Sequence, residues 1–224
     1  MKKLRTTIGQ IITTKRKGDF SMLYIFEGPR NSGKTTTINT TLALLKESGR
    51  TAYTIKFQRT ARPAPPVFMI DFLTRNYLAL IDSRSICLLD RFHLTEFVMR
   101  TLDKKVDTHV LVTTTHMIDE TLRNMGAVTF ILEATAETRQ ARLKLRDVDH
   151  NKKEWLSYDE LDTTWTYARK IFNESETRIR KIENRDDGLK LAREIVKHVD
   201  GGKLLNEKIP FLPPIIISNE VVLA

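Results

Sequence analysis

The stretch Gly28-Pro-Arg-Asn-Ser-Gly-Lys-Thr35 matches the phosphate-binding pattern G-x-x-x-x-G-K-[ST] in full. It follows the apolar run Met22 to Phe26 and precedes a helix expected to begin near Lys34, so it occupies the strand-to-helix turn that this chemistry requires. Glycines let the backbone bend around a phosphate with N–H groups pointing inward, and the helix start adds about half a positive charge. The motif predicts a site for the phosphates of a nucleotide.

Within this motif, Lys34 is suited to reach the β- and γ-phosphates, and the Thr35 hydroxyl is suited to ligate Mg²⁺. We therefore expect ATP and Mg²⁺ as cofactors. The alternative is a glycine turn with an incidental lysine. The residues predicted to bind the cofactor are Gly28, Pro29, Arg30, Asn31, Ser32, Gly33, Lys34, Thr35 and Thr36.

An acid ends the second chemically suggestive element, Ile86-Cys-Leu-Leu-Asp90-Arg91. Ligands of an open α/β sheet gather beyond the carboxyl ends of its strands, so Asp90 is expected near the phosphate-binding loop, the P-loop. There it would hold Mg²⁺, directly or through water, or accept a substrate proton. The alternative is a helix N-cap or a turn aspartate. With Thr35, Asp90 makes up the predicted metal site.

A basic helix is expected from Glu137 to Arg146, where Arg139, Arg142 and Arg146 recur at i, i+3 and i+7 and share one face. Arginines that close over a phosphoryl-transfer site stabilise the charge on the transferred oxygens. The polar segment Asp147 to Lys153 suits a lid, which we place at about 139–157. The alternative is an ordinary solvated face.

Five apolar runs are expected to form the strands that position these groups. Helical spacing of apolar residues between them implies parallel βαβ units and a sheet covered on both faces, hence a three-layer α/β domain with a mostly parallel, about five-stranded sheet. The expected strands are Met22 to Phe26, Ala52 to Phe57, Ser85 to Asp90, Val128 to Glu133 and Arg178 to Glu183.

Helix boundaries follow from glycines and acids. A helix after Lys34 should end at Gly49, and Thr108 to Met125 is favoured as helix because Gly126 stops it. Asp186-Asp187 are expected to cap a helix that continues through Val199, and another helix should run from Leu161 to Phe172.

Composition bounds the class of protein. The 224 residues are 41% hydrophobic, enough for a core, and no run reaches the roughly 18 apolar residues of a membrane span, so a cytoplasmic enzyme without a membrane partner is expected. A single cysteine, Cys87, excludes disulfides and a cysteine-based metal site and is expected to be buried. The net charge of +9 attracts phosphates of any kind.

We expect a basic extension (1–20), a core domain (21–200) and a tail (201–224) that packs on its own domain or on a second subunit.

The residues after Asp90-Arg91 suggest an acceptor pocket. Leu94 and Val98 belong to the apolar face of a helix, and His93 and Glu96 share its opposite side, where they would frame the pocket. The alternative for His93 is a satisfied structural residue.

The sequence resembles the thymidylate-kinase-like group of nucleoside and nucleotide kinases in the P-loop superfamily. The resemblance rests on Phe26-Glu27-Gly28, Phe57-Gln58-Arg59, Asp90-Arg91-Phe92 and the basic helix Glu137 to Arg146, and it spans roughly 22–199. One departure stands in the middle of the P-loop, where thymidylate kinases usually carry an acid and this chain has Arg30 and Asn31.

The resemblance implies a P-loop kinase fold with an Arg-rich lid, and it implies that Arg59 and Arg91 contact the phosphate of the acceptor. It also offers Phe68 and Phe72 as the aromatic that stacks on the base, and it implies a possible homodimer. With these additions, the predicted catalytic residues are Lys34, Asp90, Arg91, Arg142 and Arg146, and the predicted substrate-binding residues are Arg59, Phe68, Phe72, Arg91 and His93.

Three functions remain open. The favoured one is a kinase that transfers the ATP γ-phosphate to a (deoxy)nucleoside monophosphate, a small-molecule partner. The second is a nucleoside or polynucleotide 5′-hydroxyl kinase, which needs a carboxylate base where the second strand ends in Gln58-Arg59. The third is a P-loop NTPase switch or a nucleic-acid-associated ATPase. Aromatics make up 8% of the chain and do not cluster beside the basic segments, so nucleic acid is not favoured as a partner.

Overall fold

The computed structural model describes residues 22–57, 85–103, 107–124, 126–145, 158–171 and 178–201. The predicted N-terminal extension and all but the first residue of the predicted tail lie outside these ranges. The strands are β1 (Met22–Glu27), β2 (Ala52–Lys56), β3 (Ile86–Asp90), β4 (Val128–Glu133) and β5 (Arg178–Lys181). The helices are α2 (Lys34–Glu47), α4 (His93–Asp103), α5 (Thr108–Asn124), α6 (Ala136–Lys144), α7 (Tyr158–Ile171) and α8 (Arg185–Val199).

The strands form one parallel sheet in the order β2-β3-β1-β4-β5. The strand that leads into the P-loop, β1, is central. Near its carboxyl end, Phe26 pairs with Asp90 of β3 on one side and with Phe130 of β4 on the other. The ends of three strands therefore meet beside the P-loop, and the predicted parallel five-stranded sheet is confirmed.

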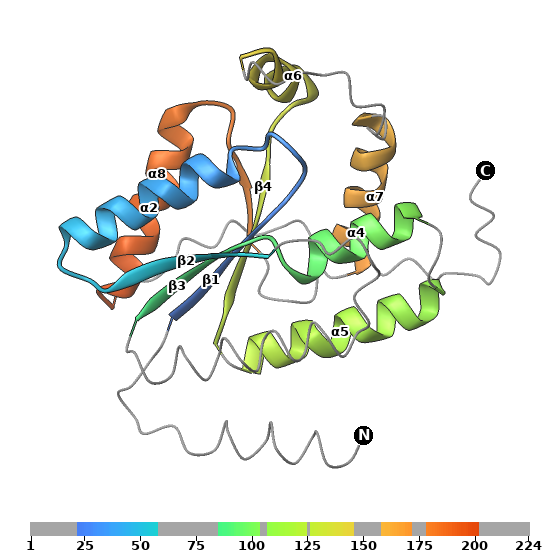
Figure 1. Cartoon of the computed structure of the whole chain (residues 1–224), viewed down its shortest axis with the longest axis horizontal. Coiled ribbons are helices and arrows are strands. Elements are labelled where there is room, and N and C mark those ends of the chain that lie inside the picture. Colours follow the sequence, from blue (N-terminus) through green and yellow to red (C-terminus); the bar gives the residue numbers. More distant parts are fainter. Residues whose placement is uncertain are drawn as a thin grey trace.

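Helices cover both faces of the sheet, with α2 and α8 on one side and α4, α5 and α7 on the other (Figure 1). Side chains of β1 alternate between the faces because strand residues point in opposite directions in turn. Tyr24 and Phe26 are fully buried with residues of α2 and α8, whereas Leu23 and Ile25 pack with residues of α5. The result is the predicted three-layer α/β domain.

Most of the expected helix boundaries hold. Gly49 (φ 76°) follows α2 and Gly126 (φ 73°) follows α5, each in a conformation that favours glycine. The expected capping of α8 by its acids is confirmed in part: Asn184 is the N-cap, and its side chain accepts from the backbone N–H of Asp187 at 3.0 Å. Asp187 completes a capping box from within the first turn, because its carboxylate accepts from the backbone N–H of Asn184.

Cys87 lies in β3 with 1% of its surface exposed, as expected for a thiol in an apolar run. Burial raises the pKa of this thiol to about 12, since the thiolate would lose its hydration. Across the described ranges, no helix combines the length and apolar character needed to cross a membrane.

Candidate active site

The P-loop joins β1 to α2 and depends on two glycines. Gly28 has φ 129°, and a Cβ added there would lie 2.1 Å from the carbonyl oxygen of Leu132 in β4. Gly33 has φ 94° and is the N-cap of α2, and a Cβ there would lie 2.9 Å from a methyl carbon of Ile182. The loop is therefore wedged against β4 and against the residue that follows β5, in a curve that only glycine permits at these positions.

Lys34 is buried and turns back into this curve. Its Nζ donates to the carbonyl oxygens of Gly28 at 2.8 Å and Pro29 at 2.6 Å, and it lies 3.3 Å from the Ser32 hydroxyl. The ammonium charge thus lies inside the loop that the motif assigns to phosphates.

The remaining residues of the P-loop motif differ in their exposure to solvent. Thr35 and Thr36 are exposed, and Arg30 is half-buried. Asn31 is buried with φ 62°, in the left-handed region that Asn tolerates better than most residues. Its carbonyl oxygen accepts from Arg142, as described below.

Asp90 and Arg91 form a turn at the carboxyl end of β3, next to the P-loop strand. Asp90 is 7% exposed, and its Oδ1 is a buried oxygen without a hydrogen-bond partner among the residues described. Arg91 has φ 66°, and its backbone N–H donates to the Phe26 carbonyl at 3.0 Å. In the described part of the chain, the Arg91 guanidinium forms no ion pair.

This turn fits the chemistry of a magnesium site. An unsatisfied carboxylate oxygen at the sheet edge is the kind of hard ligand that Mg²⁺ prefers, and Mg²⁺ is commonly held by one or two carboxylates together with phosphate oxygens and water. The residues described include no cluster of three or more His, Cys, Asp or Glu that would hold a metal through the protein alone. A site built from Asp90 and Thr35 remains a prediction.

Glu27 was not predicted as a site residue, yet it connects the two turns. It is the last residue of β1 and is fully buried. Its Oε1 accepts from the backbone N–H groups of Phe92 at 2.9 Å and Leu94 at 3.0 Å. Its Oε2 accepts from the Thr95 N–H at 3.2 Å and from the Thr95 hydroxyl. The carboxylate thus caps the N-terminus of α4, where the helix dipole favours negative charge.

Burial raises the pKa of Glu27, and this effect outweighs the opposing influence of His93 and of the hydrogen bonds from Thr95 and Leu94. The available sequence signal was an acid at the end of an otherwise apolar strand, because a buried carboxylate needs donors nearby. The position of those donors in the chain could not be read from that signal.

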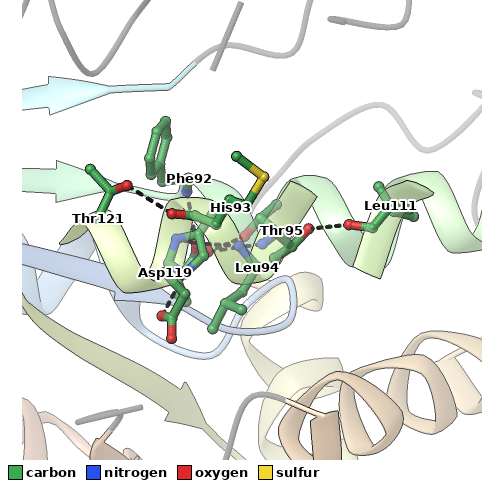
Figure 2. A network of polar contacts seen from close by, with 10 residues as sticks. Phe92, His93, Leu94, Thr95, Leu111, Asp119 and Thr121 are labelled. Atoms are coloured by element: carbon green, nitrogen blue, oxygen red, sulfur yellow. Dashed lines mark hydrogen bonds and ion pairs between the residues drawn. The ribbon is translucent and has the colours of Figure 1, made fainter. Parts of the chain in front are cut away.

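His93 lies in the same buried network (Figure 2). Its Nε2 is 3.1 Å from Oδ1 of Asp119 in α5, and its Nδ1 is 3.8 Å from Oε1 of Glu27. The ring has no exposed surface with which to contact an acceptor in this conformation. Its role in substrate binding stays a prediction. Glu96, also buried, forms an ion pair within α4 with Arg100.

The arginines of α6 have different surroundings. Arg142 donates from Nη1 to the Asn31 carbonyl at 3.0 Å and from Nη2 to the Ile182 carbonyl at 2.7 Å, so its guanidinium lies at the rim of the P-loop. Arg139 is buried and forms an ion pair with Asp162 of α7. The shared helical face predicted for them therefore contains one arginine at the loop and one that ties two helices together.

The start of α6 is held by Glu183, directly after Ile182. Its carboxylate accepts from the Thr138 hydroxyl at 2.7 Å and from the Thr135 N–H at 2.9 Å. These bonds, that of Thr138 first, lower the pKa of Glu183. The α6 helix is thus anchored beside the P-loop at its first turn.

Four predicted site residues, Arg59, Phe68, Phe72 and Arg146, lie outside the described residues. Most of the predicted lid does as well, since the description stops at residue 145 and resumes at 158. The described residues that the sequence assigned to the site come from the P-loop, the β3–α4 turn and α6.

Comparisons with known proteins give a likeness in fold. No family model matches the chain, and no curated protein matches it. Among solved structures it is similar to the thymidylate kinase of Candida albicans, a structure described as revealing the origin of broad substrate specificity and a novel structural element. The TM-score is 0.51 and the identity 15%, over 87% of this chain and 99% of that chain.

At this identity the likeness concerns the fold. The chain has a P-loop kinase fold, with a parallel five-stranded sheet and the phosphate-binding loop after the central strand.

Proposed function

We propose that the protein is a nucleotide kinase that transfers the γ-phosphate of ATP to a (deoxy)nucleoside monophosphate. The observation that carries the proposal is the buried Lys34 ammonium inside a complete P-loop, one strand away from the Asp90-Arg91 turn. A phosphotransferase needs a donor-phosphate cradle and an acceptor group side by side, and these two turns meet that requirement. The thymidylate kinase fold supports the same class of reaction.

The donor side of the site would use the backbone N–H groups of residues 30–33 and the Lys34 ammonium to hold the phosphates. On binding, Lys34 would exchange the carbonyls of Gly28 and Pro29 for phosphate oxygens. Thr35 and Asp90 would hold Mg²⁺, which when bound neutralises charge on the phosphate oxygens. Arg142 lies at the loop rim and would turn from the Asn31 carbonyl to the transferred phosphoryl group.

The acceptor side would use Arg91, whose guanidinium is charged at any working pH and offers a planar fork that matches phosphate oxygens. Arg59 is its proposed second partner, with Phe68 or Phe72 stacking on the base. Two arginines favour an acceptor that already carries a phosphate, because a bare hydroxyl needs no such partner. Location in the cytoplasm and assembly as a homodimer are further proposals, which rest on composition and on the family resemblance.

One observation favours the second candidate, a nucleoside or polynucleotide 5′-hydroxyl kinase. Asp90 keeps a buried Oδ1 without a hydrogen-bond partner in the described residues, and a carboxylate of this kind is suited to accept a proton from a hydroxyl. The same oxygen is the proposed metal ligand, so the two roles of Asp90 are distinguished by which acceptor substrate the protein phosphorylates.

The deciding experiment measures transfer of radiolabelled phosphate from ATP to each nucleoside and each monophosphate, with Mg²⁺ present. The proposal expects labelled nucleoside diphosphates. It also expects no transfer by Lys34→Ala, and normal transfer by Lys46→Ala, which changes an exposed lysine in the last turn of the same helix. Faster transfer to nucleosides than to monophosphates would favour the second candidate. Release of ADP with water alone would reject both kinases.

A further inference from the structure

Glu27 joins the P-loop to the turn that carries Asp90 and Arg91. It directly precedes Gly28, and its carboxylate accepts four hydrogen bonds from Phe92, just before α4, and from Leu94 and Thr95 in its first turn. The backbone N–H of Arg91, directly after β3, also donates to the carbonyl of Phe26, the residue before Glu27. A single side chain therefore fixes the start of α4 relative to the strand that leads into the phosphate cradle.

Helix capping alone does not require such an arrangement. Asp107 caps the neighbouring helix α5 with a local, exposed carboxylate, which accepts from the N–H groups of His109 and Val110. The α4 helix instead receives its cap from a fully buried acid 65 to 68 residues earlier in the chain. Burying a distant carboxylate carries a desolvation cost that an exposed local cap avoids. Unlike a local cap, this distant carboxylate fixes where the helix begins relative to β1.

The hydrogen-bond network around Glu27 also extends to α5. The His93 ring lies between Glu27 and Asp119 of α5, so α5 also contacts the first turn of α4. Figure 2 shows His93 beside Asp119. The turn between β3 and α4 includes Arg91 in a left-handed conformation, φ 66°, which persists only when surrounding contacts hold it.

We propose that Glu27 is a positioning residue, whose carboxylate holds Asp90 and Arg91 in place against the P-loop without touching either substrate. This inference rests on the proposed function, since it assigns Asp90 to the metal and Arg91 to the acceptor. It predicts that the loss of the cap weakens the use of Mg²⁺ and of the acceptor, while ATP binding to the P-loop is largely kept. Lys34 and Gly28 hold the loop through their own contacts.

The test compares Glu27→Gln with Thr95→Val, which removes only the hydroxyl donor, and with the control Asp107→Ala, which removes a cap of similar form from α5. For each variant we would measure the KM of acceptor and of ATP, the Mg²⁺ concentration for half-maximal rate, and Tm. Glu27→Gln should raise the acceptor KM and the Mg²⁺ requirement about ten-fold, as loss of an outer-shell partner does, with the KM of ATP changed by less than about two-fold. Thr95→Val should shift the same two quantities by less.

Asp107→Ala should lower Tm and leave both KM values unchanged. The proposal is overturned if Glu27→Gln lowers Tm alone, or if Asp107→Ala moves the acceptor KM as far as Glu27→Gln does. If Glu27→Gln does not fold, Thr95→Val decides, and an unchanged acceptor KM in that variant overturns the proposal.

A failure of the proposed function would look different. Wild-type protein would then transfer no phosphate to a monophosphate, and calorimetric titration with ATP would replace the kinetics. Titrations with and without Mg²⁺ should show that Glu27→Gln loses the Mg²⁺-dependent part of the affinity for ATP and keeps the rest. An unchanged Mg²⁺ dependence would overturn the positioning role by itself.

Discussion

Replacing Gly28 by alanine tests whether the P-loop is built against β4 as the structure describes. The new Cβ would lie 2.1 Å from the Leu132 carbonyl oxygen, a backbone atom of the interior strand β4 that cannot move aside cheaply. A non-glycine residue at φ 129° costs about 1–3 kcal/mol, and overpacking adds about 1–3 kcal/mol. The expected loss of about 2–6 kcal/mol is a large part of a typical domain stability.

Gly49→Ala is the matched control. Gly49 also has positive φ, 76°, but a Cβ there would meet no atom within 4 Å. Its cost is conformational only, about 1–2 kcal/mol. The extra loss of stability in Gly28→Ala therefore contains the contact with β4 together with the larger strain of φ 129°.

Urea unfolding followed by tryptophan fluorescence would give both stabilities, because Trp165 is buried against α4 and reports on the fold. Calorimetry would give ATP affinity. Gly28→Ala should lose more stability than Gly49→Ala and should bind ATP at least about ten-fold more weakly, since the loop must shift to relieve the overlap. Gly49→Ala should bind ATP normally. Wild-type ATP affinity in a folded Gly28→Ala protein would refute this description of the loop.

Three further predictions concern single side chains. Arg142→Ala should lower kcat by about ten-fold or more with a smaller change in ATP affinity, because the guanidinium at the loop rim acts in the transition state. A change confined to ATP affinity would instead mean that Arg142 only helps to bind ATP. Glu183 has a pKa below the ordinary 4.5, so its carboxylate stabilises the folded state above that pH and loses this effect as the pH falls through the lowered pKa. Glu183→Gln should therefore cost about 0.5 kcal/mol near neutral pH, a value reduced by solvent screening, and the difference from wild type in urea unfolding should vanish in acid. Cys87, whose pKa is raised to about 12, should resist alkylation in the folded protein and react readily in urea; fast native reaction would contradict its burial.

The strands of the sheet could be predicted from the sequence because most of them are short apolar runs. Residues such as Ile25 and Leu88 are buried whichever face they point to, so their strands appear as apolar runs. The P-loop is local as well, since its residues are consecutive. Asp90 could be placed at the sheet edge by topology alone, because the carboxyl ends of parallel strands lie together.

The features that the sequence did not predict depend on contacts between residues far apart in the chain. Nothing near Glu27 in the sequence indicates that its donors are the start of α4, because they are 65 to 68 positions away. Helical periodicity put Arg139 and Arg142 on one face, but only the packing of α7 decides that Arg139 pairs with Asp162. The acids Asp186-Asp187 were expected to cap α8, and Asp187 does so as part of a capping box, but the N-cap itself is Asn184, because Asn and Asp are both acceptable at that position.

The most direct test of the proposed kinase activity is a phosphorus NMR time course of the protein with ATP, Mg²⁺ and a mixture of nucleoside monophosphates. For a nucleoside monophosphate kinase we expect the γ-phosphate resonance of ATP to decrease while the resonances of ADP and of one or more new nucleoside diphosphates increase together. We also expect omission of the monophosphates to stop the loss of ATP. Growth of the inorganic phosphate resonance instead, or continued loss of ATP without any acceptor, would contradict it.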